Sequence, residues 1–200
     1  QGEDAWFLEG VEILKRPKKS AQANQNPAPE KENVIRWDPQ YLCRWLSLIK
    51  AAGDRLNSAS SPDPHPLIAL VALSSVSNTG EMNMPPVLLD AYRAAGYSDA
   101  QIAENMRWAY RAMLQVFAEA FPHKGLAMNM GAINVADSGG DAGHAILDEA
   151  AAVYGRRLQL GATGFGGPRE EWLKRYRDRV VVAGQTEKPD HNSTKPAQDL

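Results

Sequence analysis

The chain has 200 residues, 44% of them apolar, and a formal net charge of −2 at pH 7. This length and composition can build one hydrophobic core of ordinary size. The weak net charge gives no electrostatic basis for a nucleic-acid or anionic-membrane partner. No apolar run approaches the roughly 18 residues that are needed to span a bilayer.

Residues 1–36 are predicted to form an irregular N-terminal segment or linker. The apolar residues between Trp6 and Leu14 could form a short strand or a helical turn, and the residues after them are rich in Lys, Pro, Asn and Gln. The chain begins with Gln1 and shows no signal sequence, which would need a basic segment followed by an apolar run. We expect it to be a piece of a longer protein.

The first long helix is predicted to begin after Trp37. Asp38 is a favourable N-cap residue, Pro39 is a favourable first helical residue, and an apolar stripe continues to Leu56. The single cysteine, Cys43, excludes an internal disulfide. It falls on the apparent apolar side of this helix, which favours a buried structural thiol over a nucleophile.

Further helices are predicted along the rest of the chain. Ser98 and Gln101 have the spacing of a capping box and open a helix that ends before Pro122. Two more helices are predicted over residues 145–154 and 168–179. The tryptophans on these helical stripes are expected in the core: Trp45, Trp108 and Trp172.

Four short apolar runs predict strands, over residues 67–73, 126–130, 157–163 and 180–184. Strands that alternate strictly with helices indicate right-handed crossovers and a parallel sheet, so the predicted fold class is α/β. An open doubly wound sheet and a closed (β/α)8 barrel both satisfy this order. No strand leads into a GxGxxG or GxxxxGK[ST] sequence, which weakens the case for a nucleotide-binding sheet.

Two glutamates, Glu81 and Glu187, each follow a predicted buried strand by a few residues. Parallel strands all end at the same rim, which is where α/β barrels keep their active sites. The two acids lie three strands apart, so in a closed barrel they could converge across the mouth. Paired carboxylates about 5–5.5 Å apart suit a retaining glycosidase, in which one acid protonates the leaving oxygen and the other attacks the anomeric carbon.

Other polar residues accompany these acids at the predicted strand ends. Asn78, Asn129 and Gln185 could hydrogen-bond sugar hydroxyls or could cap loops. Trp37 could stack on a sugar ring or could pack in the core. His123 has no partner histidine at the spacing of metal ligands, and neither a metal nor a cofactor is predicted.

The segments WDPQYL, LIALVALSSVSNTGEM and AFPHKGLAMNM, in this order around two helices, resemble bacterial (β/α)8-barrel retaining glycoside hydrolases. The resemblance covers roughly residues 37–187. It implies that Glu81 is the acid/base after strand 4 and that Glu187 is the nucleophile after strand 7. In this family Asn commonly precedes the acid/base, whereas this chain has Gly80 there and Asn78 nearby.

The resemblance implies a carbohydrate substrate and a partial barrel as the catalytic domain, over residues 37–187. A complete barrel takes about 250 residues, and the chain offers only strands 4 to 7, with a remnant of strand 3 near Val11–Leu14. A disordered tail is predicted over residues 188–200. A carbohydrate-degrading role would suggest a secreted or periplasmic protein, and a chain without disulfides fits either side of a membrane.

Two other functions remain open at this stage. The chain could belong to a non-catalytic carbohydrate-binding or scaffold barrel, in which the glutamates would be dispensable. It could also belong to a barrel lyase or isomerase with a single general acid/base, for which Lys188 is the candidate lysine at a strand end. The sequence specifies neither the sugar and linkage nor the oligomeric state.

Overall fold

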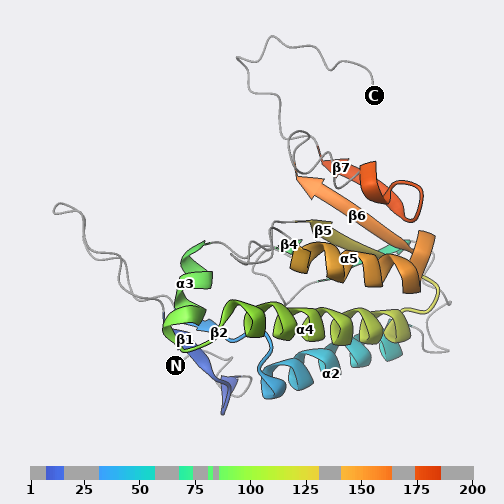
Figure 1. Ribbon diagram of the computed structural model, residues 1–200. Coiled ribbons are helices and arrows are strands. Elements are labelled where there is room, and N and C mark those ends of the chain that lie inside the picture. The colour runs from blue at the N-terminus through green and yellow to red at the C-terminus, as the bar shows by residue number, and fades with distance from the viewer. Residues whose placement is uncertain are drawn as a thin grey trace, which may run out of the picture.

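The computed structural model describes residues 8–15, 32–56, 68–73, 81–82, 86–130, 141–163 and 174–185. These residues form an α/β structure in which long helices run beside a parallel sheet (Figure 1). The predicted α/β class with a parallel sheet is therefore confirmed. Several predicted features lie outside the described residues, among them Asn78, Glu187, Trp172 and the tail from residue 188.

The parallel sheet follows the order of the chain. Its neighbouring strands are β3 (Leu70–Ala72), β5 (Gly125–Met130), β6 (Leu158–Thr163) and β7 (Val181–Gln185). A short strand, β4 (Glu81–Met82), also pairs with β5, further along it than β3 does. Every pairing in this sheet is parallel, so β3 and β4 together occupy one edge and β7 the other.

The helices begin where the capping chemistry predicts. Asp38 accepts a hydrogen bond from the backbone N–H of Tyr41 at 2.8 Å and caps α2 (Pro39–Leu56). Ser98 and Gln101 form the expected reciprocal capping box at the start of α4 (Asp99–Ala120). The structure adds α3 (Pro86–Ala94), which the sequence pattern left as a short apolar segment, and it begins α5 (Asp141–Tyr154) four residues early.

The helix order mirrors the strand order. Helix α4 packs against both α2 and α5, and the three helices run side by side along the sheet (Figure 1). Neither the strands nor the helices reverse their direction of progression. A doubly wound sheet would show a reversal at its switch point, so the described part of the chain is wound in one direction only.

The hydrophobic core lies between these helices and one face of the sheet. Leu126 and Met128 of β5 and Leu158 and Leu160 of β6 are buried in it, whereas the intervening residues of both strands are only half-buried. This alternation follows from the two-residue period of a strand. The helices therefore cover one face of the sheet, and the other face is left partly open.

Two predicted core residues are exposed. Cys43 is exposed on α2, where only Leu42 and Gly53 are fully buried, so the prediction of a buried thiol is wrong. Trp108 is 48% exposed, so its prediction as a core residue is also wrong. The buried side chains of α4 recur every three or four residues through Met106, Ala109 and Met113, and Trp108 falls outside this stripe.

Two short parts of the N-terminal segment, residues 8–15 and 32–36, are described and pack on the rest of the fold. Strands β1 (Ile13–Lys15) and β2 (Glu32–Val34) form a separate antiparallel pair. Leu14 and Ile35 contribute to the core, and Asp38 accepts a second hydrogen bond from the backbone N–H of Glu12 at 3.1 Å. The residues near Val11–Leu14 are therefore not a third strand of the parallel sheet, because their partner is the antiparallel β2.

Candidate functional site

The carboxyl-terminal edge of the sheet aligns several of the predicted site residues. Glu81 of β4 is the register partner of Asn129 of β5, Asn129 pairs in turn with Gly161 of β6, and Gly161 with Ala183 of β7. Gln185 and its partner Thr163 lie two residues further along β7 and β6. Glu81, Asn129 and Gln185 are therefore brought to the same edge, as predicted for a parallel sheet.

The row of register partners just before this one belongs to the alternating set that the helices do not cover. The preceding row of partners is Ala72, Ala127, Gln159 and Val181, which are half-buried or exposed. Gly161 and Ala183, two residues further along β6 and β7, are half-buried as well, as expected for the same alternating set. In a barrel, this uncovered set would be the interior set.

The spacing of the strands limits how closely side chains from the two outermost strands of the sheet can approach each other. Neighbouring strands lie about 4.8 Å apart, so β4 and β7 are separated by about 14 Å across a flat sheet. Carboxylates on these two strand ends could meet only if the sheet curves and both side chains reach inward. Glu187 follows the end of β7 by two residues in the sequence. Both Glu187 and Asn78 lie outside the described residues.

Trp37 packs in the core, which is one of the two roles that the sequence left open. Its ring stacks on Tyr92 with 4.4 Å between the ring centroids, and Tyr97 meets it edge-on at 5.4 Å. The side chain is buried in the core cluster. A ring already covered by tyrosines has little face to offer a sugar.

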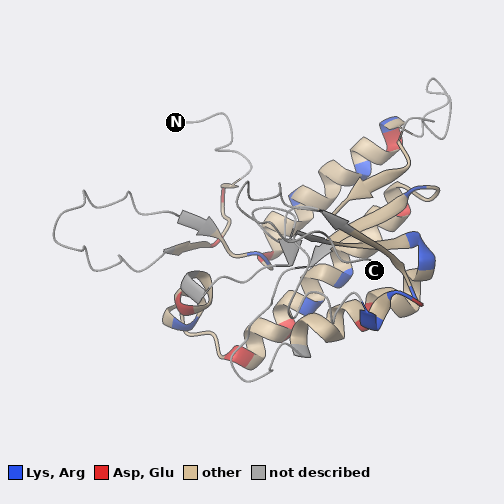
Figure 2. Ribbon diagram, turned by 90° about the horizontal axis from the view of Figure 1, so that it is seen from above, with Lys and Arg blue, Asp and Glu red and all other residues tan. Residues whose placement is uncertain are grey.

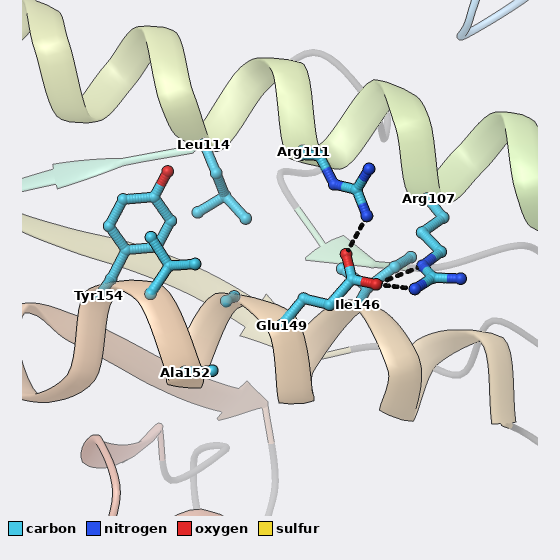
Figure 3. Close-up of a pocket in the computed structure, with 9 residues that line it drawn as sticks. Arg107, Arg111, Leu114, Ile146, Glu149, Ala152 and Tyr154 are labelled. Carbon is cyan, nitrogen blue, oxygen red and sulfur yellow. Dashed lines mark hydrogen bonds and ion pairs between the residues drawn. The ribbon is translucent and has the colours of Figure 1, made fainter.

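A groove of about 380 Å³ lies between α4 and α5, in the helix layer rather than at the strand ends (Figure 3). Leu114 of α4 and Ile146, Ala150 and Val153 of α5 supply its apolar lining. No sequence pattern reveals this groove, because it exists only where the two helices pack together.

An ion-pair cluster stands at one end of the groove. Both Arg107 and Arg111 of α4 donate hydrogen bonds to the carboxylate of Glu149 of α5, and the Arg111 bond is 2.8 Å long (Figure 3). Two cations therefore share one anion. The sequence signal that could have found them is the pair of arginines four residues apart on one side of a helix.

Tyr154 stands at the other end of the groove. Desolvation by burial raises the pKa of its hydroxyl above the ordinary value, an effect that nearby Arg157 opposes and Glu119 reinforces. The hydroxyl is therefore protonated near neutral pH. The groove thus has an apolar middle, a cationic end and a neutral hydroxyl end.

A similar cluster lies beside the groove. Asp148 of α5 accepts hydrogen bonds of 2.7 Å from both Arg175 and Arg179. Burial alone would raise the pKa of this carboxyl, but the two guanidinium groups lower it below its ordinary value. Figure 2 shows charges of both signs interspersed along the helices, so the described helices present a mixed surface rather than a field of one sign.

The described residues also bear on metal binding and membrane insertion. Within the described ranges, no group of three or more His, Cys, Asp or Glu side chains is arranged to hold a metal ion. None of the helices described is both long enough and apolar enough to cross a membrane. Comparison of the chain with protein-family models, with curated proteins and with solved structures finds no match.

Proposed function

We propose that this chain is the central part of a (β/α)8-barrel retaining glycoside hydrolase, with its active site at the carboxyl-terminal edge of the parallel sheet. The observation that carries the proposal is the strand order. Four parallel strands follow one another in chain order, and their register aligns Glu81 with Asn129 at the strand ends. Barrel enzymes keep their active sites at this edge.

The one-way winding supports a barrel over a doubly wound sheet. A barrel also explains why one alternating set of strand residues is left uncovered, since in a closed barrel this set fills the interior. Strands β3/β4 and β7 would then face each other obliquely. Closure would shorten the separation of about 14 Å that a flat sheet imposes between their ends.

In this proposal Glu81 is the general acid and Glu187 is the nucleophile. Glu81 donates a proton to the glycosidic oxygen as the carboxylate of Glu187 attacks the anomeric carbon, which breaks the bond to the leaving group and forms a glycosyl-enzyme ester. Glu81 then removes a proton from water as that water hydrolyses the ester. Asn129, Asn78 and Gln185 hydrogen-bond the sugar hydroxyls during both steps.

The proposal is tested by hydrolysis of a panel of aryl glycosides by the full-length protein and by its Glu81→Gln variant. Loss of a general acid costs about 10²- to 10⁴-fold in rate. Glu104→Gln is the matched control, because Glu104 is an exposed glutamate of α4. Equal rates for Glu81→Gln and the unaltered protein would refute the acid/base assignment. Sugar binding without turnover in the unaltered protein would identify the non-catalytic alternative.

A further inference from the structure

We propose that the groove between α4 and α5 is a second ligand site, which binds a small amphipathic carboxylate with an aliphatic body. The site is independent of the proposed glycosidase centre, because it lies in the helix layer and uses none of the residues at the strand ends. A volume of about 380 Å³ is at the low end of the range for small-molecule pockets, so the ligand is small.

The lining of the groove sets the character of the ligand body. Leu114, Ile146 and Ala150 present aliphatic carbon, and Val153, which also lines the groove, is 72% exposed. An exposed valine beside an apolar groove leaves hydrocarbon surface in contact with water. An aliphatic chain in the groove would remove that surface from water, at about 25 cal/mol per Å² of buried apolar area.

The charges at the cationic end set the character of the ligand head. Arg107 uses Nε and Nη2, and Arg111 uses one Nη2, to bind the single carboxylate of Glu149. Their other N–H donors have no acceptor among the described residues. A second carboxylate would balance the two cations and could accept these donors, in the paired geometry that guanidinium groups favour.

The neighbouring charges leave this end cationic. Asp148, the nearest acid along α5, is already held by Arg175 and Arg179, and none of these three residues lines the groove. At the far end of the groove, Glu119 and Arg157 act on Tyr154 with opposite signs. Among the residues that line the groove, the surplus positive charge therefore lies at Arg107 and Arg111, which favours a ligand with its anion at one end only.

The proposal is tested by calorimetric titration of the full chain with octanoate. Two probes separate the two parts of the ligand: acetate carries the charge without the chain, and 1-octanol carries the chain without the charge. The variant Arg111→Gln removes one cation at an exposed position. The variant Arg175→Gln is its matched control, because it removes another exposed guanidinium, one that pairs with Asp148 outside the groove.

Octanoate is expected to bind more tightly than both acetate and 1-octanol. Arg111→Gln should weaken octanoate binding by about tenfold, the effect of losing one charge-assisted hydrogen bond, whereas Arg175→Gln should leave it unchanged. The aspartate in a Val153→Asp variant should repel the carboxylate and weaken binding as well. Undetectable octanoate binding, equal binding of 1-octanol, or equal losses in the two arginine variants would each overturn the proposal. Coverage of the groove by a second copy of the chain, seen as a dimer that octanoate cannot enter, would overturn it too.

Discussion

Glu81 of β4 and Asn129 of β5 are register partners in neighbouring parallel strands. Only one residue of β5, Met128, separates Asn129 from the partner of Ala72, although eight residues of the chain separate Ala72 from Glu81. Strands β3 and β4 therefore pair with the same strand, one after the other along β5. This arrangement places an acidic residue at the edge where the proposed chemistry occurs.

The two proposed acids can be told apart by the leaving group of the substrate. A phenyl glycoside needs a proton on its departing oxygen, whereas a dinitrophenyl glycoside departs as a stable phenolate. In the full-length protein, Glu81→Gln should therefore cost the phenyl substrate about 10²- to 10⁴-fold in kcat/KM and cost the dinitrophenyl substrate far less. Glu187→Gln should abolish turnover of both. Equal losses with both substrates in Glu81→Gln would contradict its role as the acid.

Arg157 joins the end of α4 to the start of β6. Its guanidinium donates to the carbonyl oxygens of Ala118, Phe121 and Lys124 at 2.6–3.0 Å, at the end of α4 where helical carbonyls lack internal partners. Arg157→Ala should therefore lower the free energy of unfolding by about 2–4 kcal/mol. The neighbouring exposed residue provides the control, because Arg156→Ala should change stability by less than about 0.5 kcal/mol.

Urea denaturation of the two variants measures this difference. Arg157→Lys should recover only part of the loss, since an ammonium group cannot satisfy three carbonyls in the forked geometry of a guanidinium. Equal stability of the Arg157 and Arg156 variants would show that the carbonyl contacts do not stabilise the fold.

Local chemistry was sufficient to predict some features and insufficient for others. The caps at Asp38 and Ser98 depend on residues within three positions, so the sequence alone predicted both helix starts. The pairing of β1 with β2 and the pairing of β4 with β5 depend on contacts between distant segments. Such contacts produce no periodic pattern of apolar residues along the chain from which the pairing could be predicted.

The exposed Trp108 illustrates a second limit. A helix with apolar residues on more than one side has an ambiguous buried stripe, and the sequence does not say which side faces the core. The role of the arginine pair of α4 could not be predicted from the sequence either. Arg107 and Arg111 look like solvated charges until α5 brings Glu149 against them. The groove could therefore be found only from the packing of the two helices.

Asp38 links the residue just before β1 to the start of α2. One carboxylate oxygen accepts from the Tyr41 N–H and the other accepts from the Glu12 N–H. Asp38→Ala should lower the free energy of unfolding by about 1 kcal/mol through loss of the helix cap. Leaving the N–H of Glu12 without an acceptor should lower it by about 1–3 kcal/mol more. Asp38→Asn should cost less, because it keeps one acceptor for the cap. Denaturation curves that place Asp38→Asn at or below Asp38→Ala would contradict this division of roles.

Gly53 allows α2 and α4 to approach closely. A Cβ at position 53 would lie 2.7 Å from the Cβ of Ala120 and closer still to its carbonyl oxygen. Gly53→Ala gains up to about 1 kcal/mol in helix propensity, but overpacking costs about 1–3 kcal/mol, so we expect net destabilisation. Ser47→Ala, at an exposed position of the same helix, should be neutral or slightly stabilising. A gain in melting temperature for Gly53→Ala would show that the helices can separate at no cost.

Tyr176 makes the stability of the fold sensitive to alkaline pH. Its side chain is buried, and its hydroxyl donates to the carbonyl oxygen of His144 at 3.3 Å. Desolvation, reinforced by the negative charge of Asp148, raises the pKa of Tyr176 to about 12, although Arg175 and Arg179 oppose the shift. A tyrosine whose folded pKa is raised stabilises the fold fully below the unfolded pKa of about 10, and this contribution is lost as the pH rises towards 12.

Replacing Tyr176 by phenylalanine keeps the ring and removes the titrating group. Below pH 9 the variant should be less stable than the unaltered protein by about 1 kcal/mol, the contribution of one hydrogen bond, and this difference should not change with pH. Between about pH 10 and 12 the unaltered protein should lose stability faster than the variant, so the two curves converge. The variant keeps some alkaline slope, because burial also raises the pKa of Tyr92 and Tyr110. Parallel curves up to pH 12 in urea denaturation would show that Tyr176 ionises as readily in the folded chain as in the unfolded one.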